Sequence, residues 1–525
     1  MTDGVNPSSF DDLVSQRRSK LDAFRVAGTN PFPARFDVRD CASDVHVRHA
    51  ALLHGGHAEE SVTVAGRVMT RRDMGKTIFA HVQDLSGKIQ IYLKKDELGD
   101  VFSAFQNGVD LGDIVGVTGF PFRTRTGEVT VHAKSWILLS KALRPPPEKF
   151  HGMTDVDIRY RRREVDLFSN EDVRARFLAR QRIVSSLRHT LLKHHFIEVE
   201  TPMLQTVAGG AAAKPFTTHH NALDMSLSLR IAPELFLKRL LVGGLDRVFE
   251  IGRAFRNEGI DTRHNPEFTI LEAYQAYTDV HGMMDLTETL IQDAARAVGP
   301  LGRAPSLESS EGTVRASTPE GSVPSAESTS GRLFSYRKKT VDLSLPFARV
   351  SLPQVFQEKL GLDYEALCRD NGWRAAAQNM GFEVEGMPDA KCFDLLLDEK
   401  IIPGLPPAAF LYGYPAAFSP LAKARPETPD IADRFELFIC GEEVANAYSE
   451  QNDPDVQRKH FEAQARQRQA GDDEAMPADE EFLVALEHGM PPAGGLGIGV
   501  DRLTMILTGT DSIREVILFP LLRPE

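Results

Sequence analysis

A strand–loop–strand pattern between Val248 and Tyr277 is the sequence feature that most constrains how this chain can fold. Two apolar-rich runs, Val248–Phe255 and Phe268–Tyr277, alternate in side-chain character with a period of two residues and predict an antiparallel strand pair. The loop between them carries Arg256, Glu258, Arg263, His264 and Asn265. Such a mixed polar cluster suits a phosphorylated ligand, but it is also compatible with a surface hairpin whose charges are solvated.

Strand parity gives the second run a polar face. Because successive side chains of a strand point to opposite sides, Phe268, Glu272 and Tyr274 must share one face with Ile270. A carboxylate and a phenol on that face would be unusual in a strand buried in an apolar core. The pattern therefore predicts that this face belongs to a site.

Composition places the chain among ordinary soluble proteins. Its 525 residues are 42% hydrophobic and 26% charged, which is typical of a globular protein of roughly two to four domains. The net charge of −13 argues against a broadly basic surface but allows a local one. Four cysteines without C-x-x-C spacing indicate neither a disulfide framework nor a zinc site. With no signal-like segment and no long apolar run, we expect a cytoplasmic protein without a membrane association.

The chain divides by pattern into four parts. Residues 1–60 look helical and polar, 61–143 contain five short alternating strands, 144–168 form a linker, and 169–525 form a large mixed domain. A low-complexity insertion, rich in Ser, Pro, Glu, Gly and Thr, interrupts the last part at about 301–336. The expected fold class is α+β, with the five strands closing into a small barrel of the oligonucleotide-binding type.

The outer face of the predicted barrel carries a candidate base-binding surface. Parity puts Phe79 outside, with Gln90 outside on the next strand and with Arg71 and Arg72 nearby. An exposed aromatic ring beside an amide and a cation can stack on and read an unpaired base. The alternative is a barrel whose outer aromatic side chains pack on a neighbouring domain.

A second candidate hairpin contains the sequence R-F-E-L-F-I-C-G-E-E-V-A-N-A-Y-S-E, with a turn expected at Gly441 and Glu442. After the turn, Asn446, Tyr448 and Glu450 share one face, and small residues share the other. Polar groups on one side and small ones on the other predict a polar site. Glu436 and Glu443 flank the turn and could bind one divalent cation, although surface carboxylates are commoner than metal ligands.

The last element, G-G-L-G-I-G-V-D-R, has glycines at 495, 497 and 499 along a strand, and Arg502 at the start of a helix. Neither the G-x-G-x-x-G turn nor a G-x-x-x-x-G-K-[ST] loop is present. Alternating glycines remove the side chains from one face of a strand. We expect a flat aromatic ring to lie on that face while Arg502 reaches its phosphates.

Three elements in order resemble the motifs of the class II aminoacyl-tRNA synthetases: a helix and strand ending at Pro202, the F-R-N-E-G loop with Arg256, and G-L-G-I-G-V-D-R with Arg502. The barrel makes the chain similar to the aspartate, asparagine and lysine subgroup. Longer matches resemble the lysyl-tRNA synthetases: G-G-A-A-A-K-P-F, R-I-A-P-E-L, F-R-N-E-G-I-D-T-R-H-N-P-E-F, E-V-A-N-A-Y-S-E-Q-N-D and I-R-E-V-I-L-F-P. The resemblance covers Ser61 to Pro524 except the insertion, and it implies a catalytic domain with a mainly antiparallel sheet flanked by helices.

This resemblance implies a two-step reaction, in which ATP and L-lysine form lysyl-adenylate and the lysyl group then passes to the 3′ end of tRNA(Lys), with release of AMP and pyrophosphate. It implies Mg²⁺ as cofactor, held by Glu436 and Glu443, and a homodimer. Arg256 and Arg502 would be catalytic. The implied ATP-binding residues are Arg256, Glu258, His264, Asn265, Phe268, Glu436 and Arg502. Phe268 would stack on the adenine.

The same resemblance implies a set of residues for the amino acid and another for the anticodon. Glu450 with Tyr274 would bind the ε-ammonium of lysine, Glu234, Glu272 and the backbone at Gly210 the α-ammonium, and Asn446 the carboxylate. Arg256 and Tyr448 complete the implied lysine pocket. The implied anticodon-binding residues are Arg71, Phe79, Gln90 and Glu128.

Departures from the family pattern are a shorter segment at about 389–415, Gln451 in place of a leucine, and Ala416 where an acidic residue is usual. Two other functions stay open at this stage. A related ligase could transfer lysine to a protein, but the complete set of barrel strands argues against it. A tRNA-binding paralogue without activity would have no need of Arg256, Glu436, Glu443, Glu450 and Arg502.

Overall fold

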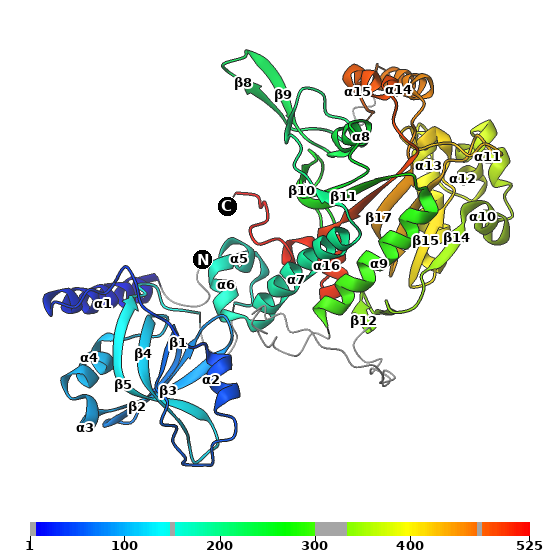
Figure 1. Ribbon diagram of the computed structural model, residues 1–525. Helices are drawn as coiled ribbons and strands as arrows, with labels where there is room; N and C mark the ends of the chain where they lie inside the picture. Colours follow the sequence, from blue (N-terminus) through cyan, green and yellow to red (C-terminus); the bar gives the residue numbers. More distant parts are fainter. Residues whose placement is uncertain (1–6, 148–152, 300–332, 470–474, 525) are drawn as a thin grey trace. The chain divides into compact units, whose positions relative to one another are not determined.

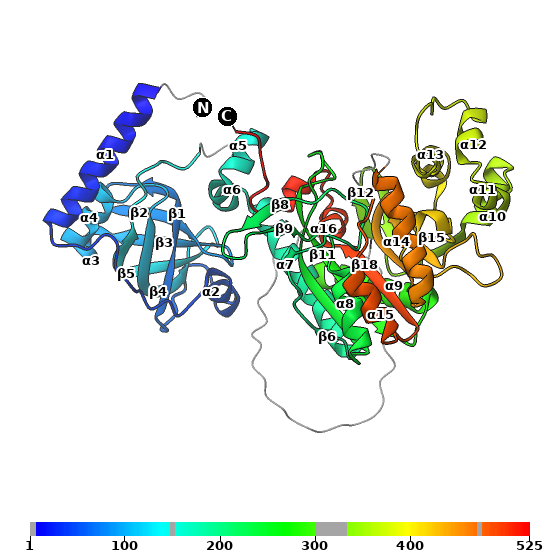
Figure 2. The same cartoon turned by 90° about the horizontal axis from the view of Figure 1, so that it is seen from above.

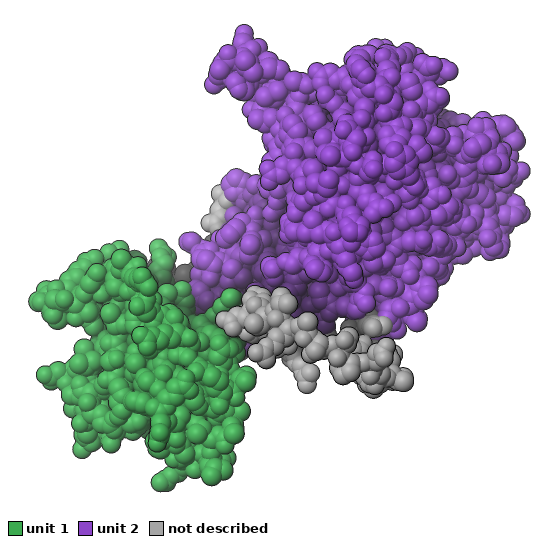
Figure 3. Space-filling model, in the orientation of Figure 1, with its two compact units in different colours: residues 1–154, 303–320 green, residues 155–302, 321–525 purple. Residues whose placement is uncertain are grey.

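A computed structural model describes residues 7–147, 153–299, 333–469 and 475–524. Within the described residues the chain forms two compact units, which meet in sequence between Thr154 and Asp155 (Figure 3). Each unit has its own apolar core, so each is described by itself.

The first unit is a closed five-stranded barrel with the strand order β1-β2-β3-β5-β4 (Figure 1). Its strands alternate in burial as parity predicts, with Ile78, Ala80 and Val82 inside. Its helices and strands are α1 (Pro7–Val26), α2 (Ala42–Arg48), β1 (Val62–Asp73), β2 (Thr77–Gln83), β3 (Lys88–Lys94), α3 (Lys95–Leu98), α4 (Asp100–Gly108), β4 (Ile114–Arg123) and β5 (Val129–Ser140).

Helix α1 packs against the barrel through Phe24, which is 7% exposed. A Cβ at Gly108 would overlap the Phe24 ring, so only glycine permits this close approach at the end of α4. The ring also meets the edge of Trp136 with centroids 6.4 Å apart. The predicted N-terminal helical extension is thus an integral part of the barrel's packing.

The second unit is built on an eight-stranded sheet with the order β14-β15-β16-β17-β18-β11-β10-β6. Only the pairs at its two edges, β14 with β15 and β10 with β6, are parallel. The strands of this sheet are β6 (Ile197–Glu198), β10 (Arg247–Phe255), β11 (Glu267–Ala276), β14 (Ala348–Ser351), β15 (Ala408–Tyr412), β16 (Arg434–Ile439), β17 (Glu442–Ser449) and β18 (Ala493–Gly499). The prediction of a mainly antiparallel sheet is confirmed.

One face of this sheet is covered by three helices, α7 (Glu171–Lys193), α9 (Val280–Val298) and α16 (Val500–Thr508), as Figures 1 and 2 show. The helices and that face bury one large apolar cluster, to which Leu187, Leu290 and Ala447 belong. Removing this much apolar surface from water is what fixes the strand registers. The opposite face keeps the polar side chains, and the candidate site is built there.

Smaller elements flank the sheet. Between β14 and β15 a helical insertion encloses its own aromatic cluster around Trp373, which is 1% exposed. The remaining elements are α5 (Val156–Arg161), α6 (Arg163–Ser169), β7 (Leu204–Gln205), β8 (Thr217–His220), β9 (Met225–Leu229), α8 (Glu234–Val242), β12 (Leu333–Tyr336), β13 (Lys339–Asp342), α10 (Leu352–Leu360), α11 (Tyr364–Asp370), α12 (Trp373–Asn379), α13 (Asp389–Leu396), α14 (Pro454–Gln469) and α15 (Glu480–Glu487).

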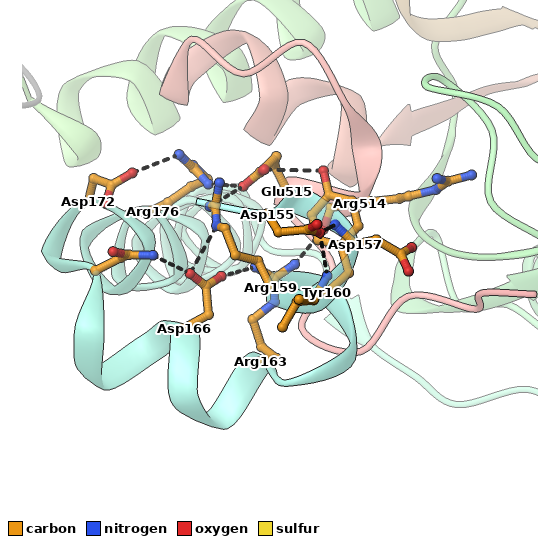
Figure 4. A network of polar contacts seen from close by, with 12 residues as sticks. Asp155, Asp157, Arg159, Tyr160, Arg163, Asp166, Asp172, Arg176, Arg514 and Glu515 are labelled. Atoms are coloured by element: carbon orange, nitrogen blue, oxygen red, sulfur yellow. Dashed lines mark hydrogen bonds and ion pairs between the residues drawn. The ribbon is translucent and has the colours of Figure 1, made fainter. Parts of the chain in front are cut away.

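A network of ion pairs joins α5, α6 and α7 to the C-terminal segment (Figure 4). Arg163 is fully buried and pairs with Asp166 at 2.6 Å while donating to the carbonyl oxygens of Arg514 and Leu518. Glu515 accepts from Tyr160 at 3.1 Å. Because a buried charge is costly unless it is paired, these contacts fix the C-terminal segment against the start of α7.

The expected α+β class is confirmed. Residues 144–168, expected as a linker, instead contain α5 and most of α6, which are held by the network above. The predicted insertion at 301–336 lies outside the described residues up to 332, and its last four residues form β12.

Candidate active site and nucleic-acid surface

The predicted strand–loop–strand element is present, with β10 and β11 paired in antiparallel register from Arg247 opposite Gln275 to Phe255 opposite Glu267. The Arg256 backbone N–H donates to the carbonyl oxygen of Pro266 at 2.9 Å, which closes the loop at its base. The Arg256 guanidinium lies 5.1 Å from the centre of the Phe268 ring. The loop thus presents a cation and an aromatic face side by side.

Two polar atoms at the base of this loop have no protein partner within the described part of the chain. They are Nε of Arg256 and Oδ1 of Asn265, and both are buried. Burial lowers the pKa of Arg256, although Glu258 and Glu443 act in the opposite direction. Because a buried polar group without a partner is costly, these atoms indicate that the site is completed by a ligand with hydrogen-bonding groups.

Arg502, at the start of α16, is directed by contacts from two other elements. Its Nη1 donates to Glu443 Oε2 at 2.9 Å, and its Nη2 lies 3.2 Å from His264 Nε2. Burial acts to raise the pKa of Asp261, but hydrogen bonds from the His264 side chain and from backbone N–H groups outweigh it and lower the pKa to about 2. An ionised Asp261 therefore fixes the imidazole at 2.8 Å, which in turn faces Arg502.

Glu436 and Glu443 lie on the same side of the β16–β17 hairpin because of a β-bulge. Leu437 pairs with Ala445 but Phe438 pairs with Glu443, so Val444 is an extra residue on β17. Strict alternation would have put Glu443 on the opposite face from Asn446. The turn itself is formed by Cys440 and Gly441, both at positive φ, one residue earlier than expected.

The Glu436 side chain is 16% exposed, and its carboxylate accepts hydrogen bonds from Tyr414 at 2.8 Å and from Arg434 at 2.5 Å. Burial raises its pKa to about 7; Arg434 opposes the shift and the neighbouring Glu443 adds to it. A carboxylate whose pKa is raised by burial and by a second carboxylate forms a place where an added cation is stabilised. Within the described residues, no cluster of three or more His, Cys, Asp or Glu side chains arranged for a metal ion is present.

Five of the residues expected to bind the amino acid meet over β11, α8 and the end of β17 together with one further residue, Lys238, and we call these six residues the pocket floor. Tyr274 donates from its hydroxyl to Glu272 at 3.0 Å, and Tyr448 donates to Glu234 at 2.6 Å. Glu450 is 1% exposed, and its Oε1 has no hydrogen-bond partner among the described residues. The pocket floor consists of Glu234, Lys238, Glu272, Tyr274, Tyr448 and Glu450.

Burial dominates the proton affinities of the pocket floor. It raises the pKa of Glu272 to about 8, with Glu234 adding to the shift and the Tyr274 hydroxyl opposing it. Burial also raises the pKa of Glu450 well above its ordinary value, against the effect of Lys238. Carboxylates in this state favour an added cation, because a cation lets them ionise.

The strand of alternating glycines differs from expectation at one position. Gly495 lies opposite Tyr274 and Tyr448, and a Cβ there would overlap Oε1 of Glu450 and lie 2.5 Å from the Tyr274 ring. The face at Gly495 is therefore filled by the chain's own side chains, and no ring of a ligand can lie there. At Gly497 the nearest atom to such a Cβ is 3.7 Å away. Only the part of the face from Gly497 onwards is open.

Two buried cations, Lys238 in the pocket floor and Arg230 beside it, were not predicted from the sequence. Lys238 donates to Glu234 at 2.6 Å, and Arg230 pairs with Glu250 at 2.5 Å while its guanidinium lies over Gly252. The signal for Lys238 was present in the sequence, because it follows Glu234 by four residues and so lies on the same helix face. Arg230 had no such local signal.

Two further residues expected in the lysine pocket, Gly210 and Asn446, make defined contacts in the structure. Gly210 adopts a φ of +88°, and a Cβ there would lie 3.0 Å from the Cβ of Glu234, so glycine is needed for the close approach to α8. Asn446 accepts from Arg434 at 3.2 Å and lies opposite Gly497. Both residues border the pocket floor.

On the barrel, three of the four expected anticodon residues come together. Glu128 accepts from Gln90 at 2.8 Å and lies 2.7 Å from the ring nitrogen of His81. The Phe79 ring contacts Tyr92 with centroids 4.8 Å apart. Aromatic rings beside an ordered amide form a surface on which bases could stack.

Arg71 does not join this surface. Val68 pairs with Val82 but Thr70 pairs with His81, so Met69 is an extra residue and the parity of β1 reverses there. The Arg71 guanidinium turns to the end of α4 and donates to the carbonyl oxygens of Gln106 and Val109, both at 2.5 Å. Arg72, which is exposed, lies directly opposite Phe79. The structure thus contradicts the expected position of Arg71 and puts Arg72 beside the aromatic ring.

The fold agrees with comparisons with known proteins. Residues 155–523 match the class II tRNA synthetases (D, K and N), and residues 62–139 match the OB-fold nucleic acid binding domain of the tRNA anticodon type. The chain therefore belongs to the class II tRNA synthetases.

Similar proteins in these comparisons indicate which member of this class the chain resembles. A lysine–tRNA ligase of Staphylococcus saprophyticus is 46% identical over 98% of this chain and 99% of its own length. Those of Carboxydothermus hydrogenoformans and Staphylococcus haemolyticus are 47% and 46% identical, with the same coverage of 98% and 99%. The chain belongs to the lysine–tRNA ligase family, as the sequence motifs indicated.

Among the helices of the described ranges, none is long and apolar enough to cross a membrane.

Proposed function

We propose that this chain activates L-lysine with ATP to form lysyl-adenylate and transfers the lysyl group to the 3′ end of tRNA(Lys). The observation that carries the choice of amino acid is the excess of buried carboxyl groups over buried cations in the pocket, because a cationic substrate lets such carboxyl groups ionise. Four buried carboxylates and two buried cations lie together there: Glu234, Glu250, Glu272, Glu450, Arg230 and Lys238. When all are ionised their charges sum to 2 − 4 = −2, which favours a cationic substrate and opposes an acidic one.

Lysine carries two ammonium groups, and the pocket floor offers them separate partners. Glu450 Oε1, with the Tyr274 ring beside it, is the acceptor for the ε-ammonium, while Glu272 and Glu234 with Gly210 receive the α-ammonium. Asn446 borders the place of the carboxylate. A charge-assisted hydrogen bond contributes about 1.5–3 kcal/mol, so losing one or two of them rejects a neutral analogue.

The first step needs no covalent enzyme nucleophile. Arg256 is proposed to bind the α-phosphate and the lysine carboxylate together, which brings the reacting groups into contact and stabilises the charge that builds on phosphorus. Arg502, fixed by Glu443 and His264, binds the γ-phosphate. Phe268 supplies a ring for the adenine. The Nε of Arg256, which has no hydrogen-bond partner among the described residues, supports a phosphate at this position.

The acidic pair at the β16–β17 hairpin fits Mg²⁺. Glu436 and Glu443 offer hard oxygen ligands, and the pKa of Glu436, raised by burial and by the charge of Glu443, supports a cation beside this pair. When bound there, the ion would neutralise phosphate charge. His264, Asn265 and Glu258 complete the proposed ATP site.

The barrel is proposed as the anticodon-binding domain, at residues 61–143, and the part from 169 onwards as the catalytic domain. Phe79, Gln90 and Glu128 form its base-binding surface, and Arg72 replaces Arg71 as its cation. The match of residues 62–139 to a nucleic-acid-binding family supports tRNA over a protein as acceptor of the lysyl group.

A homodimer is proposed through the edge of the catalytic sheet. β6 is the terminal strand, and about half of the surface of Leu192, Ile197, Met203 and Leu204 is exposed around it. An exposed apolar edge strand favours association with a second copy. Sedimentation should show a dimer that Ile197→Asp dissociates. Four free cysteines agree with a reducing compartment, and we propose the cytoplasm.

Amino-acid-dependent exchange of pyrophosphate into ATP tests the function directly. Each amino acid is supplied in turn, and exchange should depend on lysine. Charging of tRNA should then require the barrel, so deletion of residues 1–143 should abolish charging and spare exchange. Exchange with another amino acid and none with lysine would contradict the proposal.

A further inference from the structure

A lysine of the chain itself, Lys238, lies inside the pocket floor. Its side chain is 0% exposed, and its Nζ donates to Glu234 Oε1 at 2.6 Å and forms an ion pair with Glu450. Glu234 lies one helical turn before Lys238 on α8, whereas Glu450 comes from the segment after β17. A single ammonium therefore joins two elements that are more than 200 residues apart in sequence.

Besides these two carboxylates, the ammonium of Lys238 faces two aromatic rings. The Tyr448 ring centre is 5.3 Å from Nζ, and the Phe482 ring centre is 6.0 Å from it. Burial lowers the pKa of Lys238, but Glu234 and Glu450 outweigh the burial and raise it above its ordinary value. Lys238 is thus a fixed cation between two carboxylates, with aromatic rings on its other sides.

We infer that Lys238 is a positioning residue that sets the specificity of the amino-acid pocket: it fixes Glu234 and Glu450 in place before lysine binds. This inference rests on the proposed lysine pocket. Both carboxylates bind one nitrogen and so lie close together. Without that nitrogen, like charges at this separation would repel, and one carboxyl would take up a proton. A protonated Glu450 would no longer attract an ammonium.

Fixation by Lys238 also leaves a defined acceptor. Lys238 engages Oε2 of Glu450, while Oε1 keeps no hydrogen-bond partner among the described residues. The charged groups facing Glu450 come from each element around it: Lys238 and Glu234 from α8, and Glu272 from β11. Glu450 Oε1 is therefore held where an incoming ammonium can reach it.

Lys238→Met and Lys238→Gln test this role. Met keeps the length of the side chain but removes its charge, and Gln retains hydrogen-bond donors without the charge. The matched control is Lys141→Met, because Lys141 is also fully buried and bound to two carboxylates, Asp110 and Asp113, but lies in the barrel. Pyrophosphate exchange gives the KM for lysine and for ATP from about pH 6.5 to about pH 8.5.

We expect Lys238→Met to raise the KM for lysine about tenfold or more at neutral pH. The ratio to the wild type should grow as the pH falls, because the unpaired carboxyls then bind protons, and the KM for ATP should stay within about twofold. Lys238→Gln should show the same pattern to a smaller degree. Lys141→Met should lower the thermal stability and leave the KM for lysine unchanged.

An unchanged KM for lysine in both variants, a ratio that does not depend on pH, or an equal rise in the KM for ATP would overturn the inference. If Lys238→Met does not fold, the KM for lysine of Lys238→Gln decides the test. Glu450→Gln separates the two levels of the proposal. If Glu450→Gln weakens lysine binding and the Lys238 variants do not, only the role of Lys238 fails; if Glu450→Gln also has no effect, the lysine pocket is assigned wrongly.

Discussion

Gly495→Ala should impair lysine binding while sparing ATP binding. Gly495 is central in β18, where the added methyl group would overlap Oε1 of Glu450 and lie 2.5 Å and 2.8 Å from two carbons of the Tyr274 ring. Carbon atoms at van der Waals contact are about 3.5–4.0 Å apart, so the ring must move by about 1 Å. Neither neighbour is a flexible surface group: both are buried, and Glu450 is held by Lys238.

The size of the expected increase in the KM for lysine follows from the contact that the substitution removes. Displacing Glu450 removes one charge-assisted hydrogen bond to the substrate, about 1.5–3 kcal/mol. At 1.4 kcal/mol per factor of ten, the KM for lysine should rise about 10- to 150-fold. Overpacking should also lower the stability of the fold by about 1–3 kcal/mol.

Gly497→Ala is the matched control, two residues further on the same face. There the new Cβ would lie 3.7 Å from Ile270, 3.8 Å from Asn446 and 3.9 Å from Glu272, which are ordinary contacts. Pyrophosphate exchange with lysine and ATP varied separately, together with thermal melts, measures both variants. Equal effects of the two substitutions on the KM for lysine would refute the reasoning, because the loss would then not come from Glu450.

Three further results are expected. Glu450→Gln should raise the KM for lysine and leave that for ATP nearly unchanged; an unaltered lysine KM would remove Glu450 from the pocket. Arg72→Ala should raise the KM for tRNA and spare pyrophosphate exchange, whereas Arg71→Ala should mainly lower the melting temperature of the barrel; the reverse pattern would contradict the bulge. Burial raises the pKa of Glu272 to about 8, so the folded protein keeps a proton that the unfolded chain releases above about pH 4.3, and this group destabilises the fold progressively as the pH rises between the two values. In the absence of ligands, the melting temperature of Glu272→Gln minus that of the wild type should therefore increase from pH 5 to pH 8. A difference that does not change with pH would contradict the raised pKa of Glu272.

The sequence by itself located the main strands and proposed the residues of the candidate site. Period-two alternation located the β10–β11 hairpin, the five barrel strands and the faces of Glu272 and Tyr274, because alternation depends only on local backbone geometry. The resemblance of the motifs added the family, and comparison with the ligases of other organisms confirmed it. These inferences need nothing beyond local pattern and order along the chain.

Tertiary structure decided what local pattern cannot encode. An extra residue in a strand, Met69 in β1 or Val444 in β17, reverses the parity that follows it; the first bulge exchanges the places of Arg71 and Arg72, and the second brings Glu443 to the side of Glu436. A bulge forms only against a partner strand, so its place depends on pairing between distant segments. The ion pair of Lys238 with Glu450 and the filled face at Gly495 have the same cause, since each joins segments that only the folded sheet brings together.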